Sequence, residues 1–277
     1  AELTFNDVNT LGAEWRNVLR LGRITGLLSE FYQPLGETGA FYVKPALELR
    51  NESFPLWIDD AQLAEYRVNR RQAALEVGYT PQPEWRISAE LVGGKDRGDL
   101  LIGNPNDFTD SEEKYAGVFY NATLDTLDNI NFPTRGIRVS ADLETYHDVA
   151  GANVEGDVAR LTADWAQAWG RYHLLLGAHL SSALENDSFF QTQGFLGGFL
   201  NLSGFDERAL FGTQTALARA VMYRRTGNTS RLFSLPMFVG ASLETGNVWA
   251  TKDDVSDDLI LAGSLFVGFS TPLGPSR

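Results

Sequence analysis

The feature that most constrains this chain is a period-two alternation of apolar and polar residues along nearly all of its length. In segments 84–91, 137–144 and 159–165, every second residue is apolar and the residues between are polar or charged. Successive side chains of a β-strand point to opposite faces, so this pattern predicts strands with one apolar and one polar face. Helical periodicity is almost absent. The sequence therefore predicts an all-β fold.

The lengths of the alternating segments distinguish between two kinds of all-β protein. Strands of soluble proteins usually have about 5–6 residues, whereas a tilted strand that crosses a membrane needs about 9–11. Most segments here reach that length, which favours an antiparallel transmembrane β-barrel. We count thirteen segments, at 1–7, 13–22, 26–34, 40–52, 61–79, 84–95, 114–126, 135–147, 155–169, 171–183, 215–225, 232–249 and 258–271. No domain boundary interrupts them, so residues 1–277 are expected to form a single domain.

The connections between segments support the barrel. Short turns are expected at 33–36, 80–83, 131–134, 169–171 and 271–274, and longer polar connections at 53–60, 96–113, 148–154, 184–214 and 250–257. Outer-membrane barrels show this asymmetry, with short periplasmic turns and long external loops. The connection at 22–25 is short where a long one is expected. Aromatic residues near strand ends are candidates for interfacial girdles: Phe31, Tyr32, Phe41, Tyr42, Trp85, Trp165, Trp169, Tyr172 and Trp249.

A soluble β-sandwich is the alternative, because alternation alone does not show which face points outward. Glu14, Arg16 and Arg20 share one face of a segment, and the odd positions 67–71 (Arg, Asn, Arg) share a face of another. Either a water-filled lumen or a solvated outer face accommodates such charges. Segment length and loop asymmetry favour the membrane barrel.

Composition excludes several classes of function. The net charge of −13 argues against nucleic-acid binding. The absence of cysteine excludes disulfide scaffolds and cysteine-based chemistry. No apolar run is long enough for a transmembrane helix. Residues 1–4 show no signal-peptide pattern, so we expect a mature or excised piece of a longer chain.

The sequence predicts no catalytic site, no metal site and no cofactor. Of the histidines at 147, 173 and 179, His179 shares strand parity with Ser181, as a wall-borne hydrolase site would require. Polar residues that line a lumen explain the same pattern. No G-x-S-x-G elbow and no metal-ligand spacing occur. The acidic residues in 253–258 are expected to lie in a solvated loop, and weak Ca²⁺ binding is the alternative.

The most specific motif is D-T-L-D-N-I-N-F-P-T-R-G at 125–136, with Asp125, Asp128, Pro133, Arg135 and Gly136 as its key positions. A hairpin turn, with Pro ending one strand and Gly beginning the next, is a sufficient structural interpretation. The combination also resembles a signature of bacterial surface-antigen barrels. This superfamily contains outer-membrane assembly factors and two-partner secretion translocators.

Two further motifs carry the same resemblance. Segment 239–249 contains Glu244 and Gly246 and is similar to the family's acidic-x-Gly strand motif. Ser203, Gly204 and Phe205 stand where the family has the tip of an inward-folded loop, inside the Gly-rich stretch 195–223. Segments 12–16 and 29–34 most resemble the barrel of patatin-like phospholipase (type Vd) autotransporters.

The resemblance implies a bacterial outer-membrane barrel that anchors a passenger domain and helps export it, with a patatin-like lipase as the passenger. The implied partners are outer-membrane lipids, the passenger and the barrel assembly machinery. A passive porin-like channel and an outer-membrane hydrolase remain alternatives. Because the family barrel has sixteen strands, the resemblance implies one further strand before Ala1 and two after Thr271. An incomplete chain, a count of segments that is off by one, or strand exchange in a homodimer accounts for the difference.

One position departs from the family pattern. The loop-tip Arg of the family is Ser203 here, which leaves the expected partner of Glu244 undefined. Arg208 is a candidate substitute through a charge-assisted contact with Glu244. The alternative is that Arg208 pairs with Asp206 or Glu207 in a solvated loop.

Overall fold

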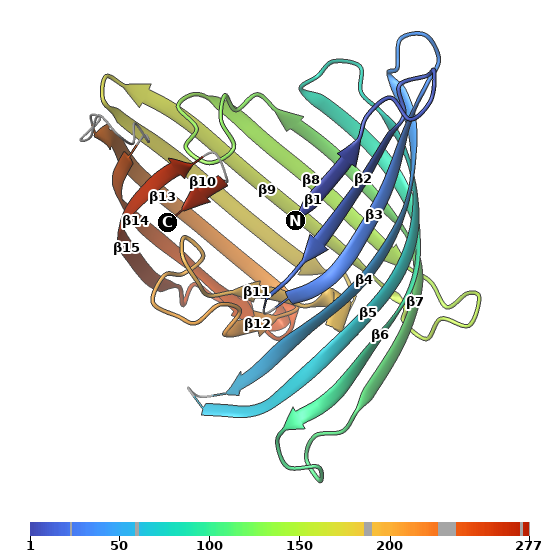
Figure 1. The fold of residues 1–277 in the computed structure, drawn as a ribbon. Helices are drawn as coiled ribbons and strands as arrows, with labels where there is room; N and C mark the ends of the chain where they lie inside the picture. The colour runs from blue at the N-terminus through green and yellow to red at the C-terminus, as the bar shows by residue number, and fades with distance from the viewer. Residues whose placement is uncertain (23, 59–60, 186–189, 227–236, 272–273, 277) are drawn as a thin grey trace. The chain divides into compact units, whose positions relative to one another are not determined.

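The computed structural model describes residues 1–22, 24–58, 61–185, 190–226, 237–271 and 274–276. One fourteen-stranded sheet takes its strands in chain order, β1 to β10 and then β13 to β16, while β11 and β12 form a separate two-stranded sheet (Figure 1). The all-β prediction is therefore confirmed. The strands are β1 (Glu2–Phe5), β2 (Glu14–Arg20), β3 (Ile24–Leu35), β4 (Phe41–Ile58), β5 (Ala61–Tyr79), β6 (Trp85–Ile102), β7 (Ser111–Asp125), β8 (Gly136–Tyr146), β9 (Gly156–Trp169), β10 (Tyr172–Ala183), β11 (Gly194–Leu196), β12 (Leu210–Gly212), β13 (Gln214–Thr226), β14 (Met237–Trp249), β15 (Ile260–Thr271) and β16 (Gly274–Ser276).

Two connections are shorter than the sequence predicted. β4 continues to Ile58 and β5 begins at Ala61, so the expected loop at 53–60 is wrong. β6 likewise continues to Ile102, which shortens the expected connection 96–113. Charged residues at 96–99 suggest a loop, but Asp96 is bonded across the extended strands, where it accepts a hydrogen bond from the Arg70 guanidinium at 2.6 Å.

The C-terminal end adds a strand to the thirteen predicted. β16 pairs antiparallel with β15, from Phe269 opposite Ser276 to Thr271 opposite Gly274. Residues 272–273 of the predicted turn 271–274 lie outside the described residues. So do residues 232–236 of the predicted segment 232–249. Among the described residues, no helix has the length and apolar character needed to span a membrane.

The chain divides into two units, which we describe separately. Unit 1 contains residues 1–122 and 142–159, and unit 2 contains residues 123–141 and 160–277. In unit 1, the sheet exposes its apolar residues and buries many of its charged ones. Leu47 is 61% exposed and Leu91 is 59% exposed, whereas Glu76 and Asp96 are 6% and 4% exposed.

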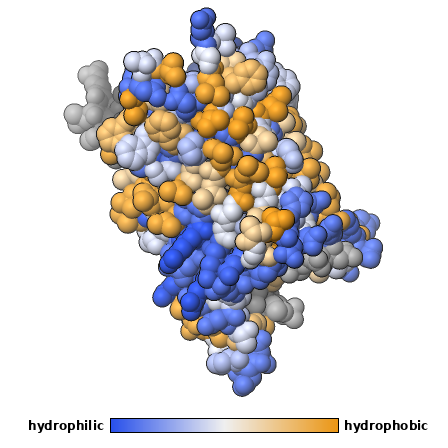
Figure 2. Space-filling view, turned by 90° about the vertical axis from the view of Figure 1, so that its right-hand side faces the viewer, coloured by the Kyte–Doolittle hydropathy of each residue, from blue (hydrophilic) through white to orange (hydrophobic). Residues whose placement is uncertain are grey.

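This distribution is the reverse of that in a soluble sandwich, where the apolar face is buried. The apolar face of unit 1 therefore suits a lipid environment, and the charged face suits a hydrated interior. Figure 2 shows the right-hand side of Figure 1. Apolar residues gather in the upper part of this view, and hydrophilic residues gather lower down on the same surface.

The two polar sets noted in the sequence lie on opposite faces of the sheet. Arg16 and Arg20 bind Glu30 and Glu48 of neighbouring strands on the charged face. Residues 67, 69 and 71 instead alternate in phase with Leu75 and Val77, which are exposed on the apolar face. Tyr32 and Tyr42 of the predicted girdle are also on the charged face, with 5.0 Å between their ring centres. The Tyr42 hydroxyl donates to Glu76 at 2.5 Å.

Unit 2 also has an exposed apolar face, with Leu243 58% and Leu265 88% exposed. The opposite face of β13 and β14 is covered by residues of the segment 190–212. Two apolar clusters join that segment to the wall. One consists of Leu196, Leu202 and Leu217, and the other of Phe132, Leu200, Val221, Tyr223 and Phe238.

Candidate functional site

The segment between β10 and β13 folds back on the wall of unit 2, as the sequence predicted. β11 and β12 pair antiparallel, with Gly194 opposite Gly212, and define a hairpin that we call the inner hairpin, residues 194–212. Its first strand lies directly on β13. A Cβ atom placed on Gly194 would stand 2.2 Å from the Thr215 hydroxyl oxygen, so only glycine allows this approach.

The tip of the inner hairpin binds a fully buried carboxylate on β14. The Ser203 backbone N–H donates to Glu244 Oε2 at 2.7 Å, and the Ser203 hydroxyl donates to Glu244 Oε1 at 2.8 Å. The Ser242 hydroxyl donates to the same Oε1 atom at 2.6 Å. Glu244 is 0% exposed. These neutral donors satisfy the carboxylate without a cation from the hairpin tip.

The suggested substitution by Arg208 is therefore wrong. The Arg208 guanidinium carbon lies 4.2 Å from the centre of the Phe195 ring, within the hairpin itself. The concern that Ser203 leaves Glu244 without a partner is also wrong, because the serine supplies its main-chain and side-chain donors together. A short side chain replaces a long one here because the backbone of the tip comes close to the wall.

The neighbouring motif residues shape this contact. Gly204 has φ +105°, which allows the tight reversal after Ser203. Phe205 packs against the apolar cluster of Leu196, Leu202 and Leu217. Gly246 lies opposite Leu217 in register, and a Cβ there would stand 2.3 Å from the Ala216 carbonyl oxygen. Gly246 thus permits close pairing of β13 and β14 near the Glu244 contact.

The 125–136 motif forms a turn held by side-chain caps. Asp128 Oδ1 accepts hydrogen bonds from the backbone N–H groups of Thr134 at 2.7 Å and Arg135 at 3.2 Å. Asp125 accepts from the Leu127 N–H at 3.0 Å, and Asn129 accepts from the Phe132 N–H at 2.9 Å. The motif's acidic and amide residues therefore close the turn.

Asp128 lies between β7 and β8, outside the strands. Burial acts to raise the pKa of this carboxyl, but hydrogen bonds from Thr134 and Arg135 outweigh that effect and lower the pKa below its ordinary value. Its contribution to stability is therefore complete above the carboxyl's unfolded pKa and is lost as the pH falls through its folded pKa.

The turn and the inner hairpin meet on one patch of the wall. The Phe132 ring stacks on Phe238 with 3.9 Å between ring centres, and Leu200 of the hairpin belongs to the same buried cluster. The Tyr223 hydroxyl donates to the Pro133 carbonyl oxygen. The two motifs that the sequence singled out are thus packed together, which their positions in the chain do not indicate.

A charged pair beside the patch adds a second link to the hairpin. Arg219 stands opposite Glu244 in register, but its guanidinium binds Asp164 at 2.9 Å and donates to the Leu200 carbonyl oxygen at 3.3 Å. Sequence reasoning missed Arg219, Asp164 and Ser242. Each of these residues lies within a regular strand and belongs to no recognisable motif. Their part in the site depends on contacts between residues that are far apart in the chain.

We predict that Gly136→Ala destabilises the turn more than Gly151→Ala does. Both glycines have positive φ, at +110° and +82°. A Cβ on Gly136 would also stand 2.2 Å from the Thr126 carbonyl oxygen, whereas a Cβ on Gly151 would meet nothing within 4 Å. The backbone strain common to both costs about 1–3 kcal/mol, so equal losses in urea unfolding would contradict the steric role of Gly136.

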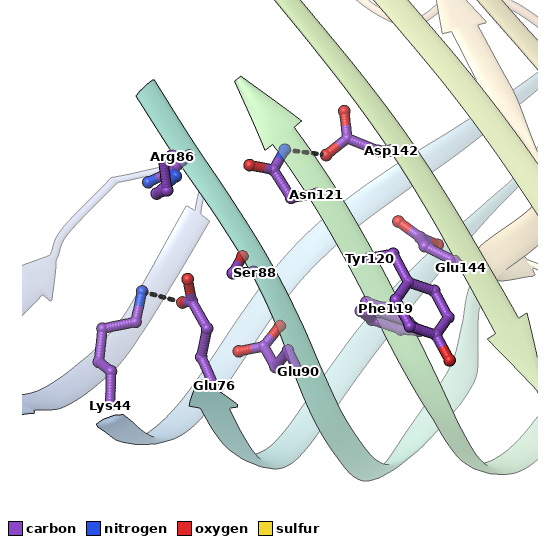
Figure 3. A pocket seen from close by; sticks show the side chains of 10 residues that line it. All are labelled: Lys44, Glu76, Arg86, Ser88, Glu90, Phe119, Tyr120, Asn121, Asp142 and Glu144. Carbon is purple, nitrogen blue, oxygen red and sulfur yellow. Dashed lines mark hydrogen bonds and ion pairs between the residues drawn. The ribbon is translucent and has the colours of Figure 1, made fainter. Parts of the chain in front are cut away.

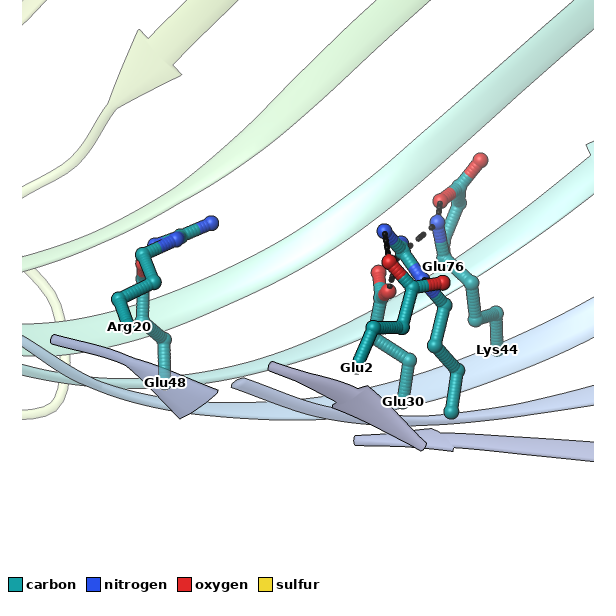
Figure 4. A network of polar contacts seen from close by, with 7 residues as sticks. Glu2, Arg20, Glu30, Lys44, Glu48 and Glu76 are labelled. Atoms are coloured by element: carbon teal, nitrogen blue, oxygen red, sulfur yellow. Dashed lines mark hydrogen bonds and ion pairs between the residues drawn. The ribbon is translucent and has the colours of Figure 1, made fainter. Parts of the chain in front are cut away.

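In unit 1, the charged face carries a network of ion pairs (Figure 4). Arg16 binds both Glu2 at 2.9 Å and Glu30 at 2.8 Å. Lys44 binds Glu76 at 2.5 Å and lies 3.7 Å from Glu30. These pairs cross from strand to strand and hold long side chains along the sheet. The face is therefore polar but well ordered.

The same face contains a polar cavity of about 310 Å³ (Figure 3). Acidic residues outnumber basic ones in its lining. Lys44 is paired with Glu76, and the Asn121 side-chain amide donates to Asp142 at 2.6 Å. The charged residues of the lining are Lys44, Glu76, Arg86, Glu90, Asp142 and Glu144. Such a lining favours water and offers little apolar surface to a passing chain.

The structure gives no support to a hydrolase site on β10. His179 Nδ1 lies 3.1 Å from the Thr162 hydroxyl, while the buried Ser181 hydroxyl oxygen has no hydrogen-bond partner in the described part of the chain. His179 thus does not activate Ser181. Among the described residues, no group of three or more His, Cys, Asp or Glu side chains could hold a metal ion. In the acidic segment 253–258, the Asp254 carboxylate accepts hydrogen bonds from the Thr251 backbone N–H at 3.0 Å and from the Thr251 hydroxyl at 2.7 Å.

A single antiparallel sheet with long strands, an exposed apolar face and a polar inner face defines an outer-membrane β-barrel protein. The Omp85 superfamily domain model matches residues 27–274, and the chain belongs to that superfamily. Membership places it in the bacterial outer membrane. No curated protein matches the chain.

Solved structures of three outer-membrane proteins show the same fold. BamA from Haemophilus ducreyi lacking POTRA domains 1–3 has a TM-score of 0.79 at 11% identity, covering 99% of this chain and 61% of its own. CdiB from Acinetobacter baumannii has a TM-score of 0.65 at 11% identity, over 98% of this chain and 50% of its own. CdiB from Escherichia coli has a TM-score of 0.67 at 13% identity, over 98% of this chain and 52% of its own. The chain thus spans about half to three fifths of the lengths of these proteins.

Proposed function

We propose that residues 1–277 form a translocator domain that anchors a passenger domain in the outer membrane and helps it reach the cell surface. The resemblance of segments 12–16 and 29–34 to patatin-like phospholipase autotransporters suggests a patatin-like lipase as the passenger. The observation that carries the proposal is the inner hairpin, whose tip is held on the wall by hydrogen bonds between Ser203 and Glu244.

That attachment suits a hairpin that leaves the wall and returns. No disulfide is involved, since the chain contains no cysteine, and the contact at the tip uses neutral donors. A net intramolecular hydrogen bond contributes about 0.5–1.5 kcal/mol, and about 1.5–3 kcal/mol when one partner is charged. Passage of a polypeptide segment can displace contacts of this size. The polar cavity of unit 1 suits a hydrated chain.

A disulfide lock tests this role. A Cβ on Gly194 would lie 3.5 Å from the Ser181 Cβ, which matches disulfide geometry. Thr215→Gly removes both atoms that would crowd the new side chain, the hydroxyl oxygen at 2.2 Å and the Cβ at 3.0 Å. The variant Gly194→Cys, Ser181→Cys, Thr215→Gly is expected to export a passenger only after reduction, measured by protease access at the cell surface. The same variant with Ser in place of each introduced Cys is the control. Equal export by locked and reduced protein contradicts a moving hairpin.

The proposed partners follow from this role. They are outer-membrane lipids, the passenger and the barrel assembly machinery. A homodimer with exchanged strands is a further proposal, and analytical ultracentrifugation in detergent tests it: a monomer at all concentrations contradicts it. The chain itself is proposed to be non-enzymatic, so His179→Ala should leave any lipid hydrolysis by the full protein unchanged.

A further inference from the structure

A groove of about 470 Å³ lies on unit 1 across β5, β6 and β7. Small residues of the apolar face, Ala73, Gly93 and Ala116, line it together with the larger Leu75 and Leu91. Leu75 and Leu91 are exposed on this face. A Cβ on Gly93 would meet nothing within 4 Å, so the groove is open at its centre. We call this feature the lipid-side groove.

Basic residues border one end of the groove. Arg71, Lys95 and Lys114 each stand two positions along their strand from Ala73, Gly93 and Ala116, and so point to the same face. Arg71 lies opposite Lys95 in register. We call these three residues the basic row. Arg71 and Lys114 are exposed, and Lys95 is half-buried.

The protein does not neutralise the basic row. Glu112 binds Lys95 at 2.7 Å and lies 4.0 Å from Lys114, so one carboxylate serves two ammonium groups. Arg71 makes no ion pair with any residue that the structure describes. Further along the same face, Arg67 is also exposed and Arg97 pairs with Asp99 at 2.8 Å. The row therefore keeps a positive charge that an anion can neutralise.

The row lies where lipid headgroups are expected. On β6, the apolar face runs from Trp85 to Gly93, nine residues, which matches the roughly 9–11 residues of a membrane-crossing strand. Lys95 is the next residue on that face. At the other end of the strands, Phe41 and Tyr79 stack with 4.6 Å between ring centres, as in an interfacial girdle.

The direction of the strands assigns the leaflet. The basic row is at the end of β6 that leads into the connection 103–110, and the longest connection of the sheet, between β10 and β13, also leaves at this end. The aromatic end leads into the shorter turn 80–84. In outer-membrane barrels the longer connections are external. The row therefore faces the outer leaflet, whose characteristic lipid is a phosphorylated glycolipid.

We propose that the lipid-side groove and the basic row together bind this glycolipid. Its phosphates contact Arg71, Lys95 and Lys114, and one acyl chain lies in the groove over Gly93. Arg and Lys suit phosphate through charge-assisted hydrogen bonds. An acyl chain that lies in the groove makes van der Waals contacts with its apolar lining, which lipids packed alongside the wall without entering the groove would not make.

Native mass spectrometry of the full protein in detergent tests the proposal, with bisphosphorylated lipid A as the probe. The wild type is expected to bind it at least about tenfold more tightly than the variant R71Q/K95Q/K114Q, because each basic residue near a membrane surface adds to attraction for anionic lipid. Phosphate-free lipid A should bind the wild type as weakly as that variant binds the phosphorylated form. Gly93→Leu should weaken binding of both forms by filling the groove.

The control variant R171Q/R224Q/R225Q removes the same charge elsewhere and is expected to bind like the wild type. Unchanged binding by R71Q/K95Q/K114Q, or an equal loss in the control, overturns the site. Equal affinity for phosphatidylglycerol overturns the assignment to the glycolipid. If the triple variant does not fold, Gly93→Leu and Arg71→Gln alone give the same comparison.

Discussion

Glu244→Ala is expected to lower the free energy of unfolding by about 2–5 kcal/mol, because it leaves several donors beneath the hairpin without an acceptor. The Ser203 N–H, the Ser203 hydroxyl and the Ser242 hydroxyl all donate to this carboxylate. Urea unfolding in lipid vesicles, followed by tryptophan fluorescence, measures the loss. The same variant should free the hairpin tip from the wall.

A double-mutant cycle isolates the tip contact. Ser203→Ala removes the hydroxyl donor but keeps the backbone N–H, so its loss should be smaller than that of Glu244→Ala. The two losses should not add, because both variants break one contact. Arg208→Ala is the control, since Arg208 lies over Phe195 and not at Glu244. Additive losses for Ser203 and Glu244, or coupling between Arg208 and Glu244, would contradict the structure.

Phe132→Ala is expected to cost about 3–5 kcal/mol, as for other buried aromatic residues. Phe132 is 6% exposed and stacks on Phe238, and its cluster includes Leu200 of the hairpin. Loss of the ring should therefore loosen the hairpin as well as the turn. Tryptic cleavage after Arg208, in the hairpin, measures the loosening.

The control for this prediction is another stacked phenylalanine. Phe41 is 55% exposed on the apolar face of unit 1 and stacks on Tyr79. Phe41→Ala should leave cleavage after Arg208 unchanged. If both variants speed cleavage equally, Phe132 does not link the turn to the hairpin.

The sequence predicts the strands well where alternation is unbroken. The segments 61–79 and 155–169 agree closely with β5 and β9. The extension of β6 is not predicted because the charged residues at 96–99 lie beyond the apolar band and indicate a loop. In the structure such residues bond across strands, as Arg70 does with Asp96 at 2.6 Å. The extension of β4, at 53–58, contains one polar residue, Ser53, so polarity does not explain why it is not predicted.

The site was predicted in its parts but not in its contacts. The turn motif, the hairpin tip and Glu244 are recognisable from local patterns. The bonding of Ser203 to Glu244 depends on how closely two backbones approach across 41 residues of chain, and no local pattern encodes that distance. The family's arginine suggested that a cation was needed, whereas buried hydroxyl and N–H donors satisfy a carboxylate equally well.

The orientation of the two polar sets illustrates the same limit. Alternation shows that Arg16 and Arg20 share a face, and likewise Arg67 and Arg71, but not that the faces differ. The structure shows that the two sets lie on different faces, because Arg20 binds Glu48 on the charged face while Arg71 is in phase with exposed Leu75 on the apolar face.

Conductance in planar lipid bilayers tests most directly the central proposal that the chain is a translocator with a movable inner hairpin and not an open porin-like channel. We expect the wild type to conduct little and to flicker, and we expect deletion of residues 195–212 to give a larger and steadier conductance. A porin-like channel would instead conduct steadily as the wild type. Steady conductance of the wild type with no change on deletion would contradict the account.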